Sequence, residues 1–281
     1  MDYGSDLDLI LVYDPAAVSP VESLTHEQAY ARLAELLVVA LSNLTRDGHL
    51  YRVDLRLRPD GRNGALAPSS HAFINYLRER ADVWEWLAYV KLRAVAGDLE
   101  FGRVVERRAR EAVHEAAGAC EAARLRAETR RVRERLERER AGPGAARAAG
   151  RPARATDIKY GPGGMLDVYF AVRYLQLRDR VPDRDDERST RASLLRLREA
   201  GSVSTEDFDA LREGYALLRE LDHGLRLIAG RSTLLPAAQD HPLLTDLARR
   251  AGYASPDALT ADLAAHMSAV RAAYERITTG A

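Results

Sequence analysis

The hydrophobic and polar positions near the start of the chain predict two strands and one helix. Residues 7–13 (LDLILVY) form a short apolar run of the kind that makes a buried strand. Residues 50–58 (LYRVDLRLR) alternate strictly, so Asp54 leaves one face of a second strand with arginines while apolar side chains leave the other. Between them, residues 26–46 gather leucine and alanine on one side of a predicted helix.

Beyond residue 70 the pattern changes to one that favours helices. Helical periodicity or a helix-start signal marks the segments 71–93, 98–140, 157–179, 204–229 and a last helix after Ser255. Ser204 and the Ser255-Pro256 pair are typical helix N-caps. Residues 60–70 predict a turn and a short edge strand, and a run of Gly, Pro and Ala at 141–156 predicts a mobile linker.

The predicted fold class is therefore α+β, a small sheet followed by a mostly helical part that we expect to be a helical bundle. We expect residues 1–98 to form the first domain and residues 99–281 the second. The first strand begins within a few residues of Met1, and a domain rarely opens without a lead-in. The sequence therefore predicts a fragment or a truncated reading frame.

The composition narrows the class of protein without changing the predicted fold. Hydrophobic residues make up 46% of the 281 residues, which favours a folded chain over a disordered one. The 42 basic and 42 acidic residues cancel, so neither nucleic acid nor a membrane is expected as a partner. The single cysteine, Cys120, excludes an internal disulfide framework and predicts a cytoplasmic protein. No apolar run is long enough to predict a membrane span.

Three carboxylates are the candidate catalytic and metal-binding residues. Asp6 and Asp8 lie two apart on the first predicted strand, so their side chains leave the same face. Two adjacent carboxylates raise each other's pKa unless a cation compensates their repulsion. Mg²⁺ is bound in proteins by one or two carboxylates together with water and phosphate oxygens. Asp54 completes a cluster of three if the two strands share a sheet.

Two arginines extend this constellation. Arg56 and Arg58 are predicted on the same strand face as Asp54, where they could bind phosphates or stabilise developing charge. The layout suits two-metal phosphoryl or nucleotidyl transfer. An Asp-x-Asp at a strand start is also common without metal, and a solvated polar face would equally explain residues 50–58. The otherwise apolar first strand favours the functional interpretation, because two aspartates there are costly unless they are used or lie at its exposed end.

Four separated motifs, in order, resemble one known family. They are GSDLDLILVYD (4–14), YRVDLRLRPDGRNGALAPSS (51–70), WEWLAYVKLRAVAGD (84–98) and DIKYGPGGMLDVYFAVRYLQL (157–177). They make most of the chain similar to the glutamine synthetase adenylyltransferase/adenylyl-removing enzymes. That family has two polymerase-β-like nucleotidyltransferase halves, each followed by a helical domain. One half transfers AMP from ATP to a tyrosine of glutamine synthetase, and the other removes the AMP by phosphorolysis.

The resemblance assigns roles to the residues already singled out. Asp6 and Asp8 match the family's metal-binding pair, Asp54 its third carboxylate, and Arg56 and Arg58 its strand arginines. It implies Mg²⁺ as cofactor, ATP as substrate, and glutamine synthetase and the PII signalling protein as partners in the regulation of nitrogen assimilation. Residues 1–98 would then be the nucleotidyltransferase domain and 99–281 a helical PII-uridylyltransferase-like domain. The RLRPDGRNGAL form and the AVAGD run favour the adenylylating half.

The chain departs from the family pattern in two places. The family's Gly-rich phosphate loop precedes the Asp pair, and the sequence does not contain it. Ser5 is a further nucleotide-binding candidate, although Gly4-Ser5 adjoin Asp6 and are not that loop. Tyr169 stands where the family usually has an acidic residue.

Several other residues have both a functional and a structural interpretation. KYGPGG (159–164), with Lys159, either binds an anion at a helix start or is a tight turn, and we expect it and Asp167 to face the active site. Arg93 is a candidate phosphate or domain-interface contact. Trp84 is expected in the core rather than as a platform for base stacking. His223 is expected at a helix–helix contact and the basic run 124–154 on a solvated helix face and linker.

The leading hypothesis is therefore an enzyme that transfers AMP to a protein tyrosine. Its first alternative is the phosphorolytic removal of AMP. A second alternative is a non-catalytic helical docking fragment that cannot hold ATP without the upstream loop. A nucleotidyltransferase for RNA or small molecules would share the Asp cluster but does not explain the later motifs.

Overall fold

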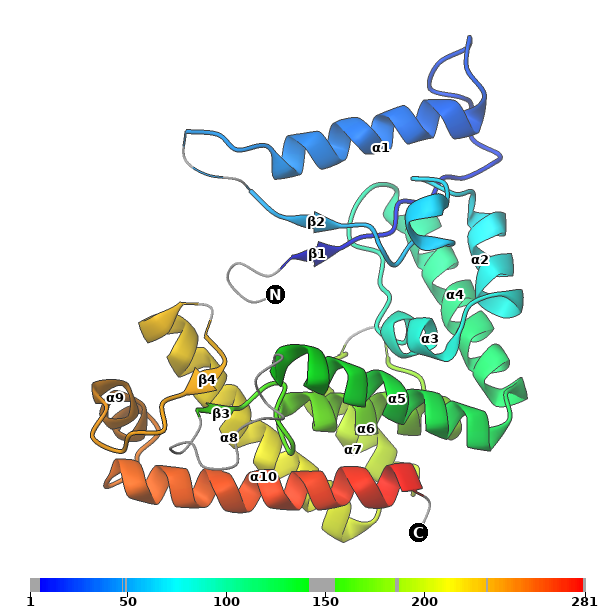
Figure 1. Ribbon diagram of the computed structural model, residues 1–281. Helices are drawn as coiled ribbons and strands as arrows, with labels where there is room; N and C mark the ends of the chain where they lie inside the picture. The colour runs from blue at the N-terminus through cyan, green and yellow to red at the C-terminus, as the bar shows by residue number, and fades with distance from the viewer. Residues whose placement is uncertain are drawn as a thin grey trace. The chain divides into compact units, whose positions relative to one another are not determined.

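The computed structural model describes residues 6–46, 48, 50–141, 155–184, 187–230 and 232–279 (Figure 1). The chain forms two compact units, Met1–Ala119 and Cys120–Ala281. The first unit extends beyond residue 98 because the helix of residues 99–119 packs on the helices before it. The functional division at residue 98 stays a prediction, and most of the predicted linker lies outside the described residues. Within those residues, no helix combines the length and the apolar character needed to span a membrane.

The described residues of the first unit form two short strands, four helices and a 3₁₀ turn. In chain order its elements are β1 (Leu7–Asp8), α1 (His26–Ser42), β2 (Val53–Asp54), η1 (Gly61–Asn63), α2 (Ser70–Glu79), α3 (Val83–Tyr89) and α4 (Leu99–Ala119). Figure 1 shows α1 alongside the two strands, while α2 and α3 pack against α4. The α+β class is confirmed, and the polymerase-β fold stays a prediction.

The strands β1 and β2 pair in parallel, with Asp8 directly opposite Asp54. Two hydrogen bonds fix this register. The Leu7 N–H donates to the carbonyl of Arg52, the residue before β2, at 2.7 Å, and the Leu9 N–H donates to the Asp54 carbonyl at 3.0 Å. In a parallel pair such bonds run slanted between the strands, and residues in register point to the same face.

Both strands are shorter than the sequence pattern predicts. The prediction of a strand over 50–58 is wrong after Asp54, because the chain turns there and the Arg58 N–H donates to the Leu55 carbonyl at 3.2 Å. The segment 7–13 pairs with β2 at its start, and Tyr13 makes only an isolated bridge to residue 69. The alternating segment 50–58 is therefore a short strand, β2, followed by a turn.

Helix α1 starts with a capping box, in which the Thr25 and Gln28 side chains each accept a hydrogen bond from the backbone N–H of the other. It buries only Ala29 and Ala34. A stripe of large apolar side chains on α1 and just after it is 42–82% exposed: Leu33, Leu36, Leu37, Val39 and Leu44. The helix contacts the rest of the unit through its two buried alanines and through Tyr30, whose ring stacks on that of Tyr13 at 4.6 Å.

The remaining helices of the first unit form its core. The predicted helix 71–93 is two helices, because α2 ends at Glu79 and Asp82 starts α3 in a capping box with Glu85. Leu77 of α2 and Leu87 of α3 are buried. The facing side of α4 presents small residues such as Ala112, which is 0% exposed and lets the helices approach closely.

The second unit is a helical assembly with one small strand pair. Its elements are α5 (Ala122–Ala141), β3 (Thr156–Asp157), α6 (Met165–Arg178), α7 (Thr190–Glu199), α8 (Thr205–Ala229), β4 (Leu234–Leu235), α9 (Pro242–Arg250) and α10 (Pro256–Thr279). The predicted N-caps are confirmed, since the hydroxyls of Ser204 and Ser255 accept hydrogen bonds from Asp207 and Ala258 at 3.1 Å. The predicted helix 98–140 breaks into α4 and α5.

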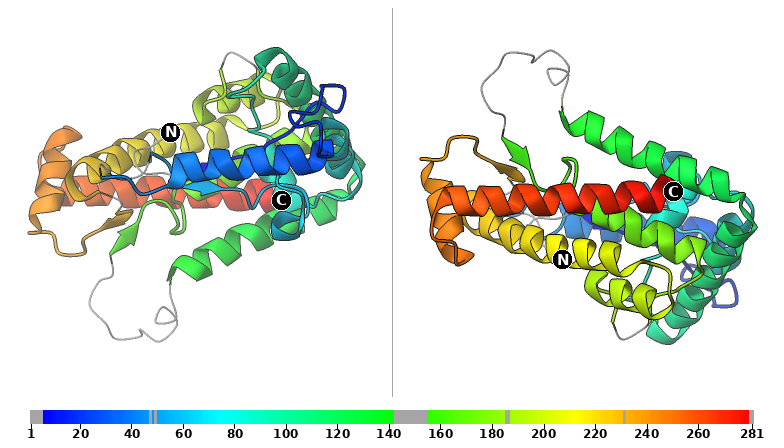
Figure 2. Two further views of the ribbon diagram at one scale, coloured as in Figure 1. Left: turned by 90° about the horizontal axis from the view of Figure 1, so that it is seen from above. Right: turned by 90° about the horizontal axis from the view of Figure 1, so that it is seen from below.

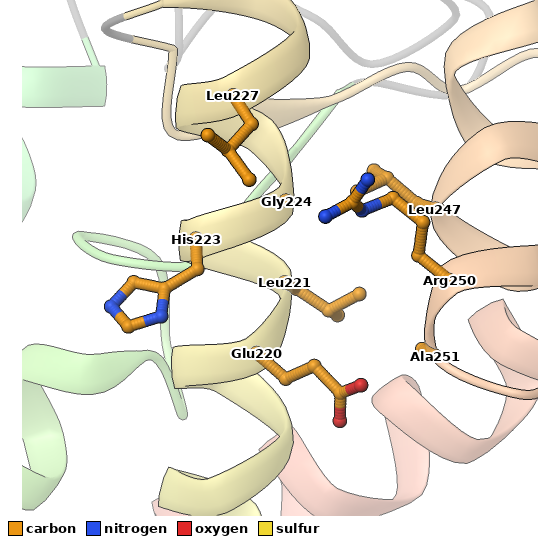
Figure 3. A pocket seen from close by; sticks show the side chains of 8 residues that line it. All are labelled: Glu220, Leu221, His223, Gly224, Leu227, Leu247, Arg250 and Ala251. Atoms are coloured by element: carbon orange, nitrogen blue, oxygen red, sulfur yellow. The ribbon is translucent and has the colours of Figure 1, made fainter.

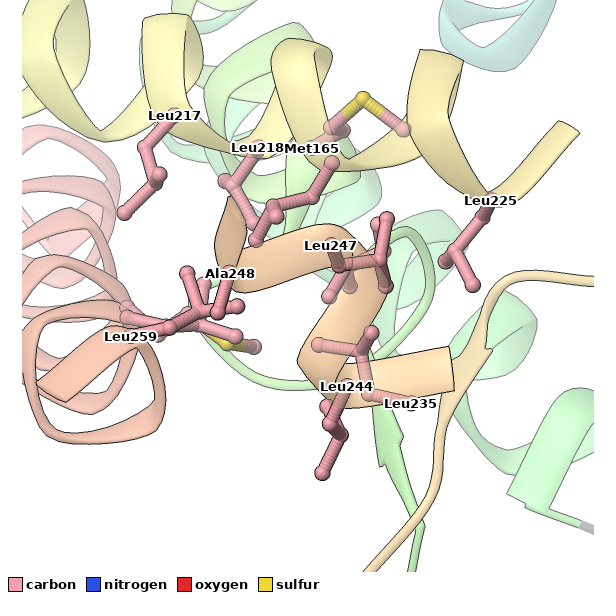
Figure 4. Close-up of a cluster of buried hydrophobic side chains, with 13 residues drawn as sticks. Met165, Leu217, Leu218, Leu225, Leu235, Leu244, Leu247, Ala248 and Leu259 are labelled. Atoms are coloured by element: carbon pink, nitrogen blue, oxygen red, sulfur yellow. The ribbon is translucent and has the colours of Figure 1, made fainter. Parts of the chain in front are cut away.

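The core of the second unit lies between its long helices. Figure 2 shows α8 and α10 running side by side, and α6 packs against both. Helix α9 inserts Leu244 and Leu247 into a cluster with Met165 of α6, Leu221 of α8 and Leu263 of α10 (Figure 4). These side chains are at most 8% exposed, so they account for much of the apolar surface that folding removes from water.

A buried ion pair joins three helices of this unit. Arg133 of α5 donates from Nε to the carboxylate of Asp167 on α6, and both side chains are 0% exposed. Arg271 of α10 lies 3.4 Å from the other Asp167 oxygen. Arg133 also pairs with Glu137 at 3.1 Å, and Arg271 pairs with Glu275 at 2.7 Å, so two cations face three carboxylates. Removing the Asp167 carboxylate would leave the fully buried Arg133 guanidinium with only the partly exposed Glu137 as an anionic partner.

We expect Asp167→Asn to lower the free energy of unfolding by about 3–5 kcal/mol, because the fully buried Arg133 guanidinium loses its buried carboxylate and keeps only the partly exposed Glu137. Glu139→Gln on α5 is the control. Glu139 is 62% exposed and pairs with Arg135 at 3.9 Å, and exposed pairs contribute roughly 0–1 kcal/mol. Urea denaturation followed by circular dichroism measures both variants. Equal, small losses would show that the buried pair does not hold the helices together.

Candidate active site

The parallel strands bring Asp8 and Asp54 to one face of the first unit. They are register partners on neighbouring strands, which in sheets lie about 4.8 Å apart. Residues in register on a parallel pair share a face, so the two carboxylates are neighbours. The sequence pattern predicted this pairing on the condition that the strands share a sheet, and the structure meets the condition.

The Asp54 carboxylate is bound by Arg56, two residues further on. The Arg56 backbone N–H donates to Oδ1 at 2.9 Å, and Nε lies 3.0 and 2.7 Å from Oδ1 and Oδ2. Nη2 makes a further bond to Oδ2. These side-chain hydrogen bonds hold the pKa of Asp54 below its ordinary value. Asp54 is therefore ionised at neutral pH, and the Arg56 side chain, 71% exposed, presents a positive charge beside it.

Asp8 has the opposite electrostatic environment. Partial burial and then the charge of Asp54 raise the pKa of its carboxyl, Asp6 adds to the rise, and Arg56 opposes it. Asp8 makes no ion pair among the described residues comparable to that of Asp54 with Arg56. The crowded acidic face is the kind of environment that a divalent cation relieves, and two carboxylates from adjacent strands are suitable ligands for Mg²⁺.

Asp6 lies just before β1, exposed, and its charge reaches Asp8. In the described part of the chain, no group of three or more Asp, Glu, His or Cys side chains is arranged to hold a metal ion. The structure therefore brings Asp8 and Asp54 together and leaves Asp6 at the open end of the strand. The three-carboxylate site stays a prediction, and Ser5 lies outside the described residues.

The guanidinium of Arg58 is directed at the backbone. It donates from Nε, Nη1 and Nη2 to the carbonyls of Gly64, Leu55 and Arg62 at 3.2, 3.0 and 3.1 Å. The predicted strand would have placed Arg58 next to Arg56 on one face. The turn after Asp54 separates them, and only Arg56 joins the carboxylate pair.

Arg93 and Trp84, two residues singled out in the sequence, are both exposed. Arg93 lies in the segment after α3 with an exposed side chain, and its role stays a prediction. The expectation that Trp84 is a core residue is wrong, because Trp84 is 38% exposed. Its neighbour Trp86 is 6% exposed and fills the core instead, since two residues along a helix change the face.

The Gly-rich loop before α6 is a structural turn. Its backbone N–H groups donate inside the unit: residues 161, 164, 165, 166 and 167 donate to nearby carbonyls, and residues 159 and 160 donate to Asp157. Gly163 donates to the Asp167 carboxylate at 2.7 Å. An anion would need free N–H groups, so the anion-binding interpretation is not supported here. The Lys159 ammonium lies 5.4 Å from the centre of the Tyr160 ring.

The expectation that Asp167 faces an active site is wrong, because its carboxylate is fully buried and paired with Arg133. Arg133 also donates to the carbonyls of Tyr160 and Gly161, so it binds the loop and the helix together. Sequence reasoning missed Arg133 because it lies in a basic run. The sequence does carry one signal for its burial. Leu125, Thr129 and Arg133 are spaced four residues apart on one face of α5, and each is at most 2% exposed.

Tyr169 replaces an expected acid beside a buried arginine. The Arg173 guanidinium lies 5.4 Å from the Tyr169 ring centre, and its Nη1 donates to Gln176 and, at 3.3 Å, to Asp183. Its Nε and Nη2 have no hydrogen-bond acceptor among the described residues. An acid at position 169 would lie one helical turn from Arg173, where it could accept those hydrogen bonds.

A separate surface cavity of about 260 Å³ lies between α8 and α9 (Figure 3). Leu221, Leu247 and the backbone at Gly224 line it, with Glu220 and Arg250 as its charged walls. Figure 3 shows the His223 ring on the side of α8 away from Arg250. His223 lies 2.7 Å from Arg219 of the same helix, and none of the predicted site residues lines the cavity.

Comparison with known proteins agrees with this division of the chain. Residues 1–108 match the family model described as glutamate-ammonia ligase adenylyltransferase. Residues 126–278 match the model described as GlnD PII-uridylyltransferase. The two matches fall on the two compact units, apart from a short stretch at their junction.

Curated relatives match the chain along its whole length. The chain is 33% identical over 292 aligned residues to the bifunctional glutamine synthetase adenylyltransferase/adenylyl-removing enzyme of Caulobacter vibrioides, covering 100% of the chain and 27% of the relative. The enzymes of the same name from Xanthobacter autotrophicus and Xanthomonas campestris are 36% and 32% identical, each over 99% of the chain and 27% and 28% of their own length. The chain spans about a quarter of the length of these relatives.

We expect Asp8→Asn to raise the melting temperature of the first unit at pH 7. The pKa of Asp8 in the folded protein lies above its ordinary value of 3.8, so its ionisation opposes folding at neutral pH. The gain should fade as the pH falls through the raised pKa towards 3.8, where the wild-type carboxyl is also protonated. Thermal melts from pH 3 to 8 measure this, with the exposed Glu22→Gln as control. A gain independent of pH would contradict the electrostatic explanation.

Proposed function

The chain belongs to the glutamate-ammonia ligase adenylyltransferase family, and on that premise we propose that it transfers AMP from ATP to a tyrosine of glutamine synthetase in a Mg²⁺-dependent reaction. The observation that carries the proposal is the register of the parallel strands, which sets Asp8 opposite Asp54 beside the Arg56 guanidinium. That arrangement supplies what nucleotidyl transfer needs: paired oxygen ligands for a divalent cation and a positive charge for phosphate.

The proposed mechanism assigns a task to each of these side chains. Asp8 and Asp54 would hold Mg²⁺, with Asp6 as a third ligand from the same strand. When bound, Mg²⁺ neutralises triphosphate charge and lowers the pKa of an attacking hydroxyl. Asp54 is ionised already because Arg56 lowers its pKa, so it is ready to bind a cation.

Arg56 would act on the phosphate side of the reaction. Its side chain is 71% exposed while it contacts Asp54, so it can bind incoming phosphate oxygens without first leaving a buried position. A guanidinium at this place would also stabilise the charge on the departing pyrophosphate. No contact among the described residues supports Arg93 or Lys159 as nucleotide ligands, and we leave both out of the mechanism.

Glutamine synthetase is the proposed protein substrate, because the relatives are named for acting on it. The PII signalling protein is a second proposed partner. Its support is the match of residues 126–278 to a PII-uridylyltransferase family model, which covers most of the second unit. Reaction with these partners would place the protein in the cytoplasm and in the regulation of nitrogen assimilation.

Two other functions fit parts of the same observations. The relatives' names include an adenylyl-removing activity, so the carboxylate pair could serve phosphorolysis of adenylylated glutamine synthetase instead. A non-catalytic docking fragment is favoured by the exposed position of Asp6 and by the missing three-carboxylate group among the described residues. The register of Asp8 with Asp54 supports a catalytic function over docking, and the RLRPDGRNGAL form and the AVAGD run lead us to rank transfer above removal.

We expect the purified chain, with Mg²⁺ and ATP labelled at the α-phosphate, to transfer label to glutamine synthetase. Asp54→Asn should lower the rate by at least about 100-fold, because it removes a charge aimed at the reacting centre. The matched control is Asp14→Asn, which changes an aspartate of the same unit outside the carboxylate pair. Label on glutamine synthetase, quantified after gel electrophoresis, is the measurement.

The same preparation distinguishes the alternatives. Release of ADP from adenylylated glutamine synthetase and phosphate, without any transfer from ATP, would replace our choice by the removing activity. No binding of Mg²⁺ and ATP by either the wild type or the Asp6→Asn/Asp8→Asn variant would favour the docking fragment.

A further inference from the structure

The turn that follows Asp54 is organised around one side chain. Arg58 donates to three backbone carbonyls, those of Leu55, Arg62 and Gly64, at 3.0 to 3.2 Å. Hydrogen bonds from a charged guanidinium to neutral acceptors are stronger than those between neutral groups. The Arg58 guanidinium therefore links the start of the turn, at Leu55, to its end, at Gly64.

Other contacts also restrict the backbone conformation of this turn. A Cβ on Gly64 would lie 1.8 Å from the Pro59 carbonyl oxygen, so the chain passes too close there for any other residue. Asp60 adopts a left-handed backbone with φ of 58° and forms an ion pair with Arg80. From α3, the buried Tyr89 donates its hydroxyl to the Leu57 carbonyl.

The path of this turn fixes the geometry of the carboxylate pair. Asp54 Oδ1 accepts the Arg56 backbone N–H at 2.9 Å, so the carboxylate is oriented by the first residue of the turn. The Arg56 guanidinium binds the same carboxylate, so both the backbone and the side chain of this turn residue hold Asp54. A change in the bend would move the charge of Arg56 and the oxygens of Asp54 together.

We propose that Arg58 is a positioning residue for Asp54 and Arg56, and not a ligand of the substrate phosphates. The proposal rests on the proposed function of the carboxylate pair as a Mg²⁺ site. Its guanidinium points to carbonyls of its own turn, and its side chain is part-buried there. A lysine keeps the charge but cannot reproduce three hydrogen bonds from a rigid fork.

The test is a Mn²⁺ titration in phosphate-free buffer, in which free Mn²⁺ is measured by electron paramagnetic resonance. We expect Arg58→Lys to raise the Kd for Mn²⁺ by about 10- to 100-fold, as losing an outer-shell partner of a metal ligand does. Arg52→Lys is the control. It changes an exposed arginine two residues before Asp54, keeps the charge, and should leave the Kd unchanged.

A second titration separates positioning from phosphate binding. In calorimetry with tripolyphosphate and no metal, Arg58→Lys should weaken binding by no more than the fold-change in its Mn²⁺ Kd, because a displaced Arg56 is the phosphate contact that it disturbs. An unchanged Mn²⁺ Kd together with weaker tripolyphosphate binding would overturn the proposal and make Arg58 a phosphate ligand. Tyr89→Phe tests the same turn from α3 and should weaken Mn²⁺ binding several-fold, so the proposal stays testable if Arg58→Lys does not fold.

Mn²⁺ binding by Asp54→Asn separates failure of the proposed metal site from failure of the positioning role. If Asp54→Asn loses Mn²⁺ binding while Arg58→Lys and Tyr89→Phe keep it, the proposed metal site stands and the positioning role falls. If Asp54→Asn binds Mn²⁺ as tightly as the wild type, the proposed metal site itself is wrong, and the positioning role falls with it.

Discussion

The parallel pairing of β1 with β2 is the constraint on which the candidate active site depends. Two hydrogen bonds, from the N–H groups of Leu7 and Leu9, set Asp8 opposite Asp54. Because side chains alternate along a strand, a slip of one residue would send Asp54 to the opposite face and separate the carboxylates. So short a pair gains little stability from its own ladder, and the turn after Asp54 supplies much of the remaining restraint.

The two units handle charge in different ways. In the first unit, Asp8 is exposed and Asp54 is 16% exposed, and Arg56 relieves their repulsion only in part. In the second unit, Asp167 and Arg133 are fully buried, and their attraction holds helices and the Gly-rich loop in place. An aspartate next to a Gly-rich loop therefore has a structural role here, although the motif by itself suggested a binding site.

Local signals in the sequence predicted several helix starts, and the expected pairing of the first two strands, which sets Asp8 opposite Asp54, is present. Ser204 and Ser255 cap helices as predicted, because an N-cap depends on residues within one turn of each other. The strand over 50–58 was predicted too long, because alternation continues through Arg58 while the chain has already turned around its guanidinium. The burial of Arg133 and Asp167 was missed, since a buried ion pair depends on partners 34 residues apart that no short pattern connects.

We propose that Asp8 and Asp54 together bind the divalent cation of a nucleotidyl-transfer site. The most direct test is a crystal structure of the protein soaked with Mn²⁺, using anomalous scattering to locate the metal. We expect an anomalous peak bound by one carboxylate oxygen from each of Asp8 and Asp54. A peak bound elsewhere, or none while Arg56 keeps both oxygens of Asp54, would contradict it.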